Sequence, residues 1–114
     1  MPSDAREAAL SAVEVFCESR VPKEHDELRL ECSPRGSSIT IFERRPPWNP
    51  ELMGTEWTRM KLAQLRYDPS SGRWSLYCCD RNGRWWPYDD IAPSASIDPL
   101  LAEIDADPTG IFWG

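Results

Sequence analysis

Residues 57–88 read WTRMKLAQLRYDPSSGRWSLYCCDRNGRWWPY, and this stretch decides the fold class. Two strand-length runs, Trp57–Tyr67 and Arg73–Asp80, flank the turn-forming group Asp68-Pro69-Ser70-Ser71-Gly72. Consecutive strands joined by a short turn pair antiparallel, because the chain reverses direction between them. The stretch therefore predicts a β-hairpin.

A second turn follows at Arg81-Asn82-Gly83. The Asn-Gly pair is typical of a type I′ turn, in which both central residues adopt positive φ. We therefore expect a type I′ turn at Asn82-Gly83 and a short last strand over Arg84–Tyr88.

Two further strands are predicted upstream, over Glu27–Cys32 and Ser38–Arg44, because polar and apolar residues alternate in both runs. The turn between them falls on Ser33-Pro34-Arg35-Gly36. In the first strand Leu28, Leu30 and Cys32 share one face and Arg29 and Glu31 the other. In the second strand Ile39, Ile41 and Glu43 share one face and Thr40 and Phe42 the other. The prolines in Pro46–Pro50 exclude a central strand and predict a crossing loop that runs to about Thr55.

Helical periodicity occurs near both ends of the chain. After a cap at Ser3 or Asp4, apolar residues recur at Ala5, Ala9, Ala12, Val13 and Phe16, and Pro22 ends the run. A short helix is predicted over Ile97–Ile104, after which Ile111, Phe112 and Trp113 should pack on the core. The sequence thus predicts one α+β domain over residues 1–114: an N-terminal helix, an antiparallel meander of about five strands and a short C-terminal helix, with both helices on one face.

The longest predicted strand has no cleanly apolar face. Strict alternation puts Trp57, Arg59, Lys61, Ala63, Leu65 and Tyr67 on one side, and Thr58, Met60, Leu62, Gln64 and Arg66 on the other. Mixed faces indicate a curved sheet, a β-bulge, or a second surface that a partner such as a second copy covers.

Charge is distributed unevenly along the chain. The net charge of the 114 residues is −6, yet Arg44–Tyr88 holds eight basic residues against four acidic ones. Most of the six tryptophans fall in the same segment. If basic and aromatic side chains share the sheet face opposite the helices, they would form a binding surface. Its candidate residues are Arg45, Trp48, Trp57, Arg59, Lys61, Arg66, Arg84, Trp85 and Trp86. The alternative is that the tryptophans are core and the arginines are its solvated rim.

Patterns of metal, cofactor and catalytic sites are absent from the sequence. His25 is the only histidine, and Cys78-Cys79 lacks the Cys-x-x-Cys spacing of redox and zinc sites, so we expect no metal and no cofactor. The four cysteines are expected to be reduced. No apolar run is long enough for a membrane span, and no secretion signal is seen, so we expect a cytoplasmic protein with no membrane partner.

A family resemblance rests on the order of four elements. They are Arg45-Pro46-Pro47-Trp48, Ala63-Gln64-Leu65-Arg66-Tyr67, Trp74-Ser75-Leu76-Tyr77 and Asp80–Tyr88, with Trp57 between the first two. This order resembles a family of small bacterial proteins catalogued only as a domain of unknown function, and it covers roughly residues 28–90. The resemblance implies a stand-alone protein and carries no activity and no catalytic residue.

Several functions fit these patterns. The sequence favours a non-enzymatic interaction module whose Arg/Trp-rich surface binds a protein partner or forms a homodimer, since a charge of −6 opposes the approach of a polyanion. A nucleic-acid-binding module is an alternative, as is a subunit whose acidic flanks contact a larger assembly. An enzyme would use Cys78 or Cys79, with its pKa lowered by the nearby arginines, or a carboxylate such as Asp80 or Asp89.

Overall fold

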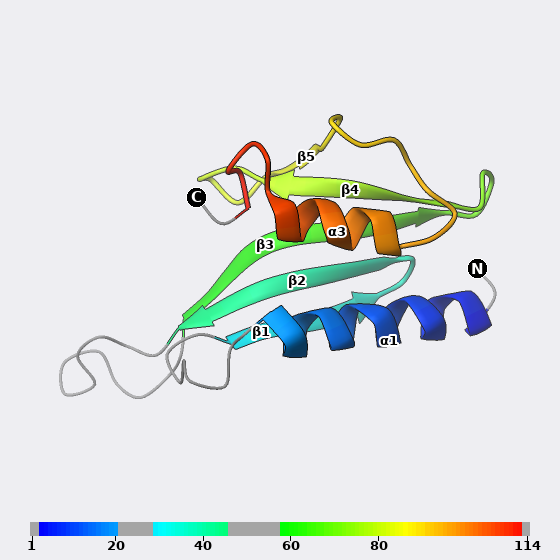
Figure 1. Cartoon of the computed structure of the whole chain (residues 1–114), viewed down its shortest axis with the longest axis horizontal. Coiled ribbons are helices and arrows are strands. Elements are labelled where there is room, and N and C mark those ends of the chain that lie inside the picture. Colours follow the sequence, from blue (N-terminus) through cyan, green and yellow to red (C-terminus); the bar gives the residue numbers. More distant parts are fainter. Residues whose placement is uncertain (1–2, 21–28, 46–57, 113–114) are drawn as a thin grey trace, which may run out of the picture.

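The computed structural model describes residues 3–20, 29–45 and 58–112. The elements, in chain order, are α1 (Ser3–Arg20), β1 (Arg29–Arg35), β2 (Ser38–Arg45), β3 (Thr58–Asp68), β4 (Arg73–Cys79), β5 (Trp85–Pro87) and α3 (Asp98–Ala106). The strands form one antiparallel sheet in the order β1-β2-β3-β4-β5 (Figure 1). The predicted α+β class and its meander of strands are confirmed.

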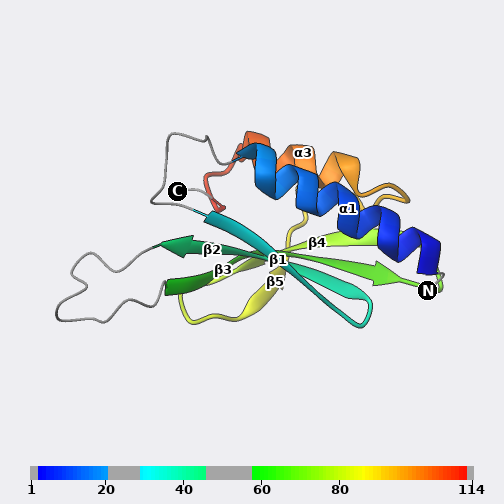
Figure 2. The same ribbon diagram turned by 90° about the horizontal axis from the view of Figure 1, so that it is seen from below.

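Both helices lie on the same face of the sheet. α1 crosses beside β1, and α3 lies next to it over the other half of the sheet (Figures 1 and 2). Figure 2, which looks along the sheet, shows that no described helix covers the opposite face. We call the helix-covered face the inner face and the opposite one the outer face. Neither helix is long and apolar enough to cross a membrane.

The core fills the space between the helices and the inner face. Each helix contributes a buried apolar stripe, because its buried residues recur three or four positions apart. The stripes are Ala9, Val13 and Cys17 in α1, and Leu100, Leu101 and Ile104 in α3. The sheet contributes Ile39, Ile41, Ala63, Leu65, Trp74, Leu76 and Cys78. Burial of one large apolar side chain contributes about 1.5–3 kcal/mol, so this layer is the main source of stability.

The first hairpin differs from its prediction in the position of its turn. β1 continues through Pro34 to Arg35, and the turn is Gly36-Ser37, with Gly36 at φ 58°. β1 is an edge strand with a partner on one side only, so the N–H that Pro34 lacks leaves no gap in the ladder. The hairpin itself and the alternation predicted for its described residues are confirmed.

The turn between β4 and β5 is not type I′ as predicted. Only Gly83 has positive φ, at 80°, whereas Asn82 does not. The Asp80 carboxylate accepts hydrogen bonds from the N–H groups of Asn82 (2.8 Å) and Arg84 (2.9 Å), and Gly83 N–H donates to the Asp80 carbonyl (3.0 Å). This aspartate-capped turn followed by one left-handed glycine takes the place of the mirror-image turn.

The C-terminal residues pack as predicted at one position and not at another. Phe112 is buried and its ring lies 5.2 Å from that of Tyr88, whereas Ile111 is 49% exposed. Trp113 lies outside the described residues, as do His25, Pro22 and the predicted crossing loop over residues 46–55.

A β-bulge interrupts the pairing of β2 with β3. Ile41 pairs with Ala63 and the next residue, Phe42, pairs with Lys61, so Leu62 is an additional residue in β3. Side chains alternate between faces, and one additional residue reverses the side to which the earlier residues of the strand point. A bulge was one of the three explanations for the mixed faces of this strand.

Candidate functional site

The bulge places the basic residues of β3 together on the outer face. Arg59 and Lys61 come before Leu62, and Gln64 and Arg66 come after it. The strict alternation expected from the sequence assigned Arg59 and Lys61 to the face of Ala63, which is wrong because of the bulge. All four polar side chains lie on the face that the helices leave open.

Basic residues outnumber acidic ones on the outer face. By register, its strand positions hold Arg29, Arg35, Arg44, Arg59, Lys61, Arg66 and Arg73 against Glu31 and Asp68. Of the two carboxylates, that of Glu31 already pairs with Arg44 at 3.1 Å. Asp68 lies at the end of β3, where its carboxylate accepts hydrogen bonds from Ser70. The centre of the outer face is therefore positively charged.

Each cation in the middle of this face lies over an aromatic ring. The contacts, measured to the ring centroid, are Arg59 over Phe42 at 3.7 Å, Arg66 over Tyr77 at 3.8 Å and Lys61 near Trp85 at 5.7 Å. A cation over the face of a ring is attracted by the ring quadrupole and loses part of its freedom of movement. The rings therefore fix where the charges lie.

Hydrogen bonds fix the same side chains further. Arg66 Nε donates to Gln64 Oε1 at 2.6 Å, and Gln64 Nε2 donates to Thr40 Oγ1 at 2.9 Å. Lys61 Nζ donates to the carbonyl of Gly83 at 3.1 Å. Thr40 is only 9% exposed although no described helix covers it, because these longer side chains lie over it. These contacts restrict the side chains of Lys61, Gln64 and Arg66.

These side chains border a shallow trough of about 320 Å³ on the outer face. Its lining consists of Ser33, Arg35, Ser38, Thr40, Phe42, Arg59, Lys61, Gln64 and Trp85. We call it the basic trough. It contains three cations, several hydroxyl and amide groups and no carboxylate, which suits a ligand with anionic oxygens.

The structure brings some of the predicted site residues together and separates others. Arg59, Lys61 and Trp85 line the basic trough. Arg84 lies in the turn, 3.4 Å from the Asp80 carboxylate, and Trp86 donates its indole N–H to the same carboxylate at 2.8 Å. Trp86 pairs with Cys78 of the inner face, so it points away from the trough and is 52% exposed.

Three other predicted site residues lie wholly or partly outside the residues that the structure describes. Arg45 ends β2, and its side chain is outside the described residues, as are Trp48 and Trp57 entirely. The described tryptophans differ in burial and in position. Trp74 belongs to the core with 3% exposure, whereas Trp85 lies on the outer face.

Sequence reasoning missed four residues of this surface: Thr40, Phe42, Gln64 and Tyr77. The alternation within β2 did separate Thr40 and Phe42 from the apolar face, and that was the available signal. The proximity of Phe42 to Arg59 and Lys61 could not be found, because it depends on the bulge.

The thiols do not fit the reactive-cysteine hypothesis. All four cysteines are free, and burial raises the pKa of both Cys78 and Cys79. Lys61 lowers the pKa of the Cys79 thiol, but burial has the larger effect. The expectation that neighbouring arginines lower these pKa values is therefore wrong.

The carboxylate alternative concerned Asp80 and Asp89. The Asp80 carboxylate accepts hydrogen bonds from the Trp86 indole and from two backbone N–H groups, and these bonds lower its pKa. Such a carboxylate is a weaker proton acceptor than an ordinary aspartate. Asp89 is exposed after β5. Within residues 3–20, 29–45 and 58–112, no three His, Cys, Asp or Glu side chains are grouped as metal ligands.

Comparison with known proteins places the chain in a family but assigns it no activity. No curated protein and no solved structure matches it. The family match is more extensive than the resemblance seen over residues 28–90, since it includes both helices. Matched along residues 1–114 by the family model described as "Domain of unknown function (DUF3024)", the chain belongs to that family of uncharacterised domains.

Proposed function

We propose that this domain is a non-enzymatic interaction module that binds an acidic segment of a partner protein in the basic trough. The observation that carries the proposal is the fixed position of Arg59 and Lys61. Each lies beside an aromatic ring on an open sheet face, in a trough without a carboxylate. Cations with so little freedom lose little entropy when a ligand binds.

The chemistry of the trough suits carboxylates. A guanidinium group presents several N–H donors in one plane, and it pairs with a carboxylate through two parallel hydrogen bonds. Arg35 and Arg59 are both exposed at the trough, and Ser33 and Ser38 add hydroxyl donors. A run of glutamate or aspartate residues would supply acceptors along its length.

Self-association through this face is less well supported than an acidic partner. Two copies packed with their outer faces together would bring the same cations into contact, which is unfavourable. The exposed residues of the trough are also mainly polar, whereas obligate dimer interfaces are apolar at their centre.

A nucleic acid is less well supported for a different reason. Proteins that bind single strands stack bases on exposed aromatic faces. Here Arg59 lies over the ring of Phe42 and Arg66 lies over that of Tyr77, so those ring faces are occupied. The net charge of −6 also opposes a long polyanion.

The test is titration of the protein with a ten-residue polyglutamate peptide that carries a neutral dye, read by fluorescence anisotropy at low and moderate salt. The trough variant is Arg59→Gln with Lys61→Gln. The matched control is Arg73→Gln with Arg81→Gln, which also removes two exposed charges, neither of which lines the trough. We expect the trough variant to weaken binding about tenfold or more and the control to change it by about threefold or less.

Three results would contradict the proposal. Equal losses in the two variants would show attraction to overall charge instead of a site. Tighter capture of a ten-residue oligothymidine than of the peptide, lost in the trough variant, would support a nucleic-acid module. A dimer in light scattering that the trough variant converts to a monomer would support self-association.

A further inference from the structure

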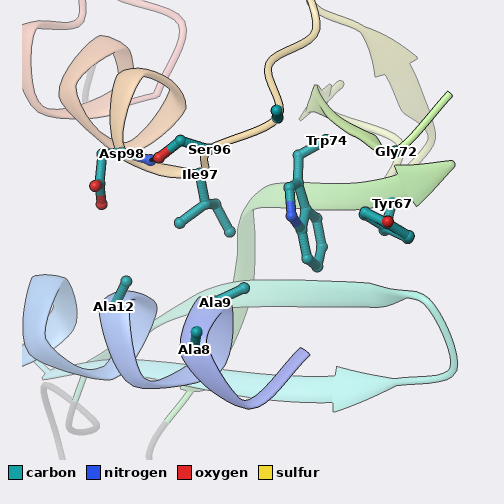
Figure 3. A pocket seen from close by; sticks show the side chains of 10 residues that line it. Ala8, Ala9, Ala12, Tyr67, Gly72, Trp74, Ser96, Ile97 and Asp98 are labelled. Carbon is teal, nitrogen blue, oxygen red and sulfur yellow. Dashed lines mark hydrogen bonds between the residues drawn. The ribbon is translucent and has the colours of Figure 1, made fainter. Parts of the chain in front are cut away.

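A second pocket lies on the inner face, between the two helices (Figure 3). It has a volume of about 360 Å³ and shares no residue with the basic trough. Its walls come from α1, from the β3–β4 hairpin and from the segment that leads into α3. The lining residues are Ala8, Ala9, Ala12, Tyr67, Gly72, Trp74, Ala95, Ser96, Ile97 and Asp98. Its volume is within the range of small-molecule sites.

The apolar walls of the pocket suit a flat ligand. Tyr67 and Trp74 form one wall, with ring centroids 5.1 Å apart and planes tilted by 57°. Opposite them, Figure 3 shows the short side chains of Ala8, Ala9 and Ala12 on α1. Alanines on the facing helix leave the space open, because a longer side chain at these positions would reach toward the rings.

Trp74 presents an unused hydrogen-bond donor to this pocket. Trp74 is 3% exposed, and within the part of the chain that the structure describes its indole Nε1–H has no protein acceptor; this nitrogen is not fully buried, so solvent in the pocket reaches it. In Figure 3 the indole nitrogen lies on the side of the ring that faces Ile97, another residue of the pocket. An acceptor atom of a bound ligand could therefore take this N–H in place of water.

The charge of the pocket selects against anions. Asp98 places a carboxylate at the pocket, and none of the ten lining residues is basic. Ser96 Oγ accepts a hydrogen bond from the Asp98 N–H at 3.3 Å, and its own hydroxyl hydrogen remains available to a ligand. A ligand with an amine or amide N–H could donate to the Asp98 carboxylate.

We propose that this pocket binds a small planar aromatic molecule, neutral or cationic, whose acceptor atom takes the Trp74 indole N–H and whose N–H group faces Asp98. Aromatic amides and amino-substituted heterocycles have this chemistry. The inference stands apart from the function proposed for the basic trough, because the two sites lie on opposite faces of the sheet and neither needs the other.

The test uses nicotinamide and nicotinate as probes. The two have the same ring and nearly the same shape, but nicotinamide is neutral and has both an acceptor and an N–H donor, whereas nicotinate is an anion without an N–H donor at neutral pH. Binding is followed by the NMR signals of the six ¹⁵N-labelled tryptophan indoles, and the signal that Trp74→Phe removes identifies Trp74. We expect nicotinamide to shift the Trp74 signal in a saturable way with a dissociation constant on the order of millimolar, and nicotinate to leave it unchanged.

A pocket-filling variant keeps the proposal testable even if Trp74→Phe is poorly folded. Ala8→Leu lines the pocket with a larger side chain and retains high helix propensity. Ser11→Leu is the matched control, since Ser11 is exposed on the same helix and does not line the pocket. Loss of the nicotinamide shift in Ala8→Leu but not in Ser11→Leu supports the site. Equal shifts with the two probes, no shift of the Trp74 signal, or binding that Ala8→Leu leaves intact would overturn it.

Discussion

The hydroxyl of Tyr88 donates a 2.7 Å hydrogen bond to the carboxylate of Glu103, and this bond ties the end of the sheet to α3. Tyr88 N–H also donates to the carbonyl of Leu76 at 2.9 Å, and its ring packs on Phe112. One residue, through its backbone N–H, its hydroxyl and its ring, thus connects the sheet, α3 and the segment after α3.

Removal of the Tyr88 hydroxyl should weaken this junction. We expect Tyr88→Phe to lower the free energy of unfolding by about 1.5–3 kcal/mol, the usual contribution of a hydrogen bond to a charged group. Urea unfolding followed by circular dichroism measures the change. Tyr67→Phe is the control, because the Tyr67 hydroxyl makes no hydrogen bond among the described residues and its loss should change little. Equal effects of the two variants would contradict the role of the Glu103 bond.

Stability should fall in alkaline solution through Cys17. Burial raises the pKa of this thiol from 9.0 to about 12. A raised pKa in the folded state means that the contribution to stability is complete below pH 9 and is lost as the pH rises toward 12. The free energy of unfolding should therefore decrease by up to about 1.4 kcal/mol per pH unit in this window.

The variant Cys17→Ala isolates this effect, with unfolding measured in reducing buffer at several pH values. The slope between pH 9 and 12 should become shallower. Val13→Ala creates a comparable gap in the same helix stripe but keeps the thiol, so it should lower stability at every pH and leave the slope unchanged. An unaltered slope in Cys17→Ala would show that other groups cause the pH dependence.

Deletion of Leu62 should remove the bulge and keep both faces of the sheet. Lys61 would then directly precede Ala63, so Ile41–Ala63 and Phe42–Lys61 would be consecutive regular pairs, and Arg59 and Lys61 would stay on the outer face. The main loss is then one buried leucine side chain, so we expect the deletion and Leu62→Ala each to lower the free energy of unfolding by about 2–5 kcal/mol. Urea unfolding followed by circular dichroism measures both variants. A deletion variant that does not fold, beside a Leu62→Ala variant that does, would show that the sheet needs the bulge itself.

The turn after β4 can be tested one residue at a time. Gly83→Ala should cost about 1 kcal/mol, because only glycine adopts a φ of 80° without strain. Asn82→Ala should stay within about 0.5 kcal/mol, since Asn82 has negative φ. Thermal unfolding of both variants is sufficient. Comparable losses of unfolding free energy in the two variants would support the type I′ turn that the sequence predicts.

Much of the fold could be predicted because its signals are local. The turns around Gly72 and Gly83 and the alternation in residues 38–44 identify neighbouring strands without knowledge of the rest of the chain. Turn type was less accessible, because the Asp80 carboxylate, and not the Asn-Gly pair, determines the hydrogen bonding there.

The sequence predicted the types of residue in the candidate site but not which of them lie together. The excess of basic residues near Arg59 and Lys61 could be seen in the sequence. Phe42, over whose ring Arg59 lies, is on another strand, and its contact with Arg59 depends on the bulge at Leu62. Trp86 was grouped with Trp85 in the predicted site because the two are adjacent in sequence. Neighbouring residues of a strand point to opposite faces, so Trp86 lies on the other face of the sheet. The thiol pKa values depend on burial, which sequence spacing does not reveal.

The described residues of the two faces carry opposite charges. α1 and α3 expose Glu7, Glu14, Glu18, Asp98 and Asp105 on one side, and the basic residues of the outer face lie on the other. A charge separation of this kind turns a molecule in the field of a charged neighbour before contact, so an acidic partner would meet the outer face first despite the net charge of −6. Added salt would shorten the reach of this alignment and slow the encounter.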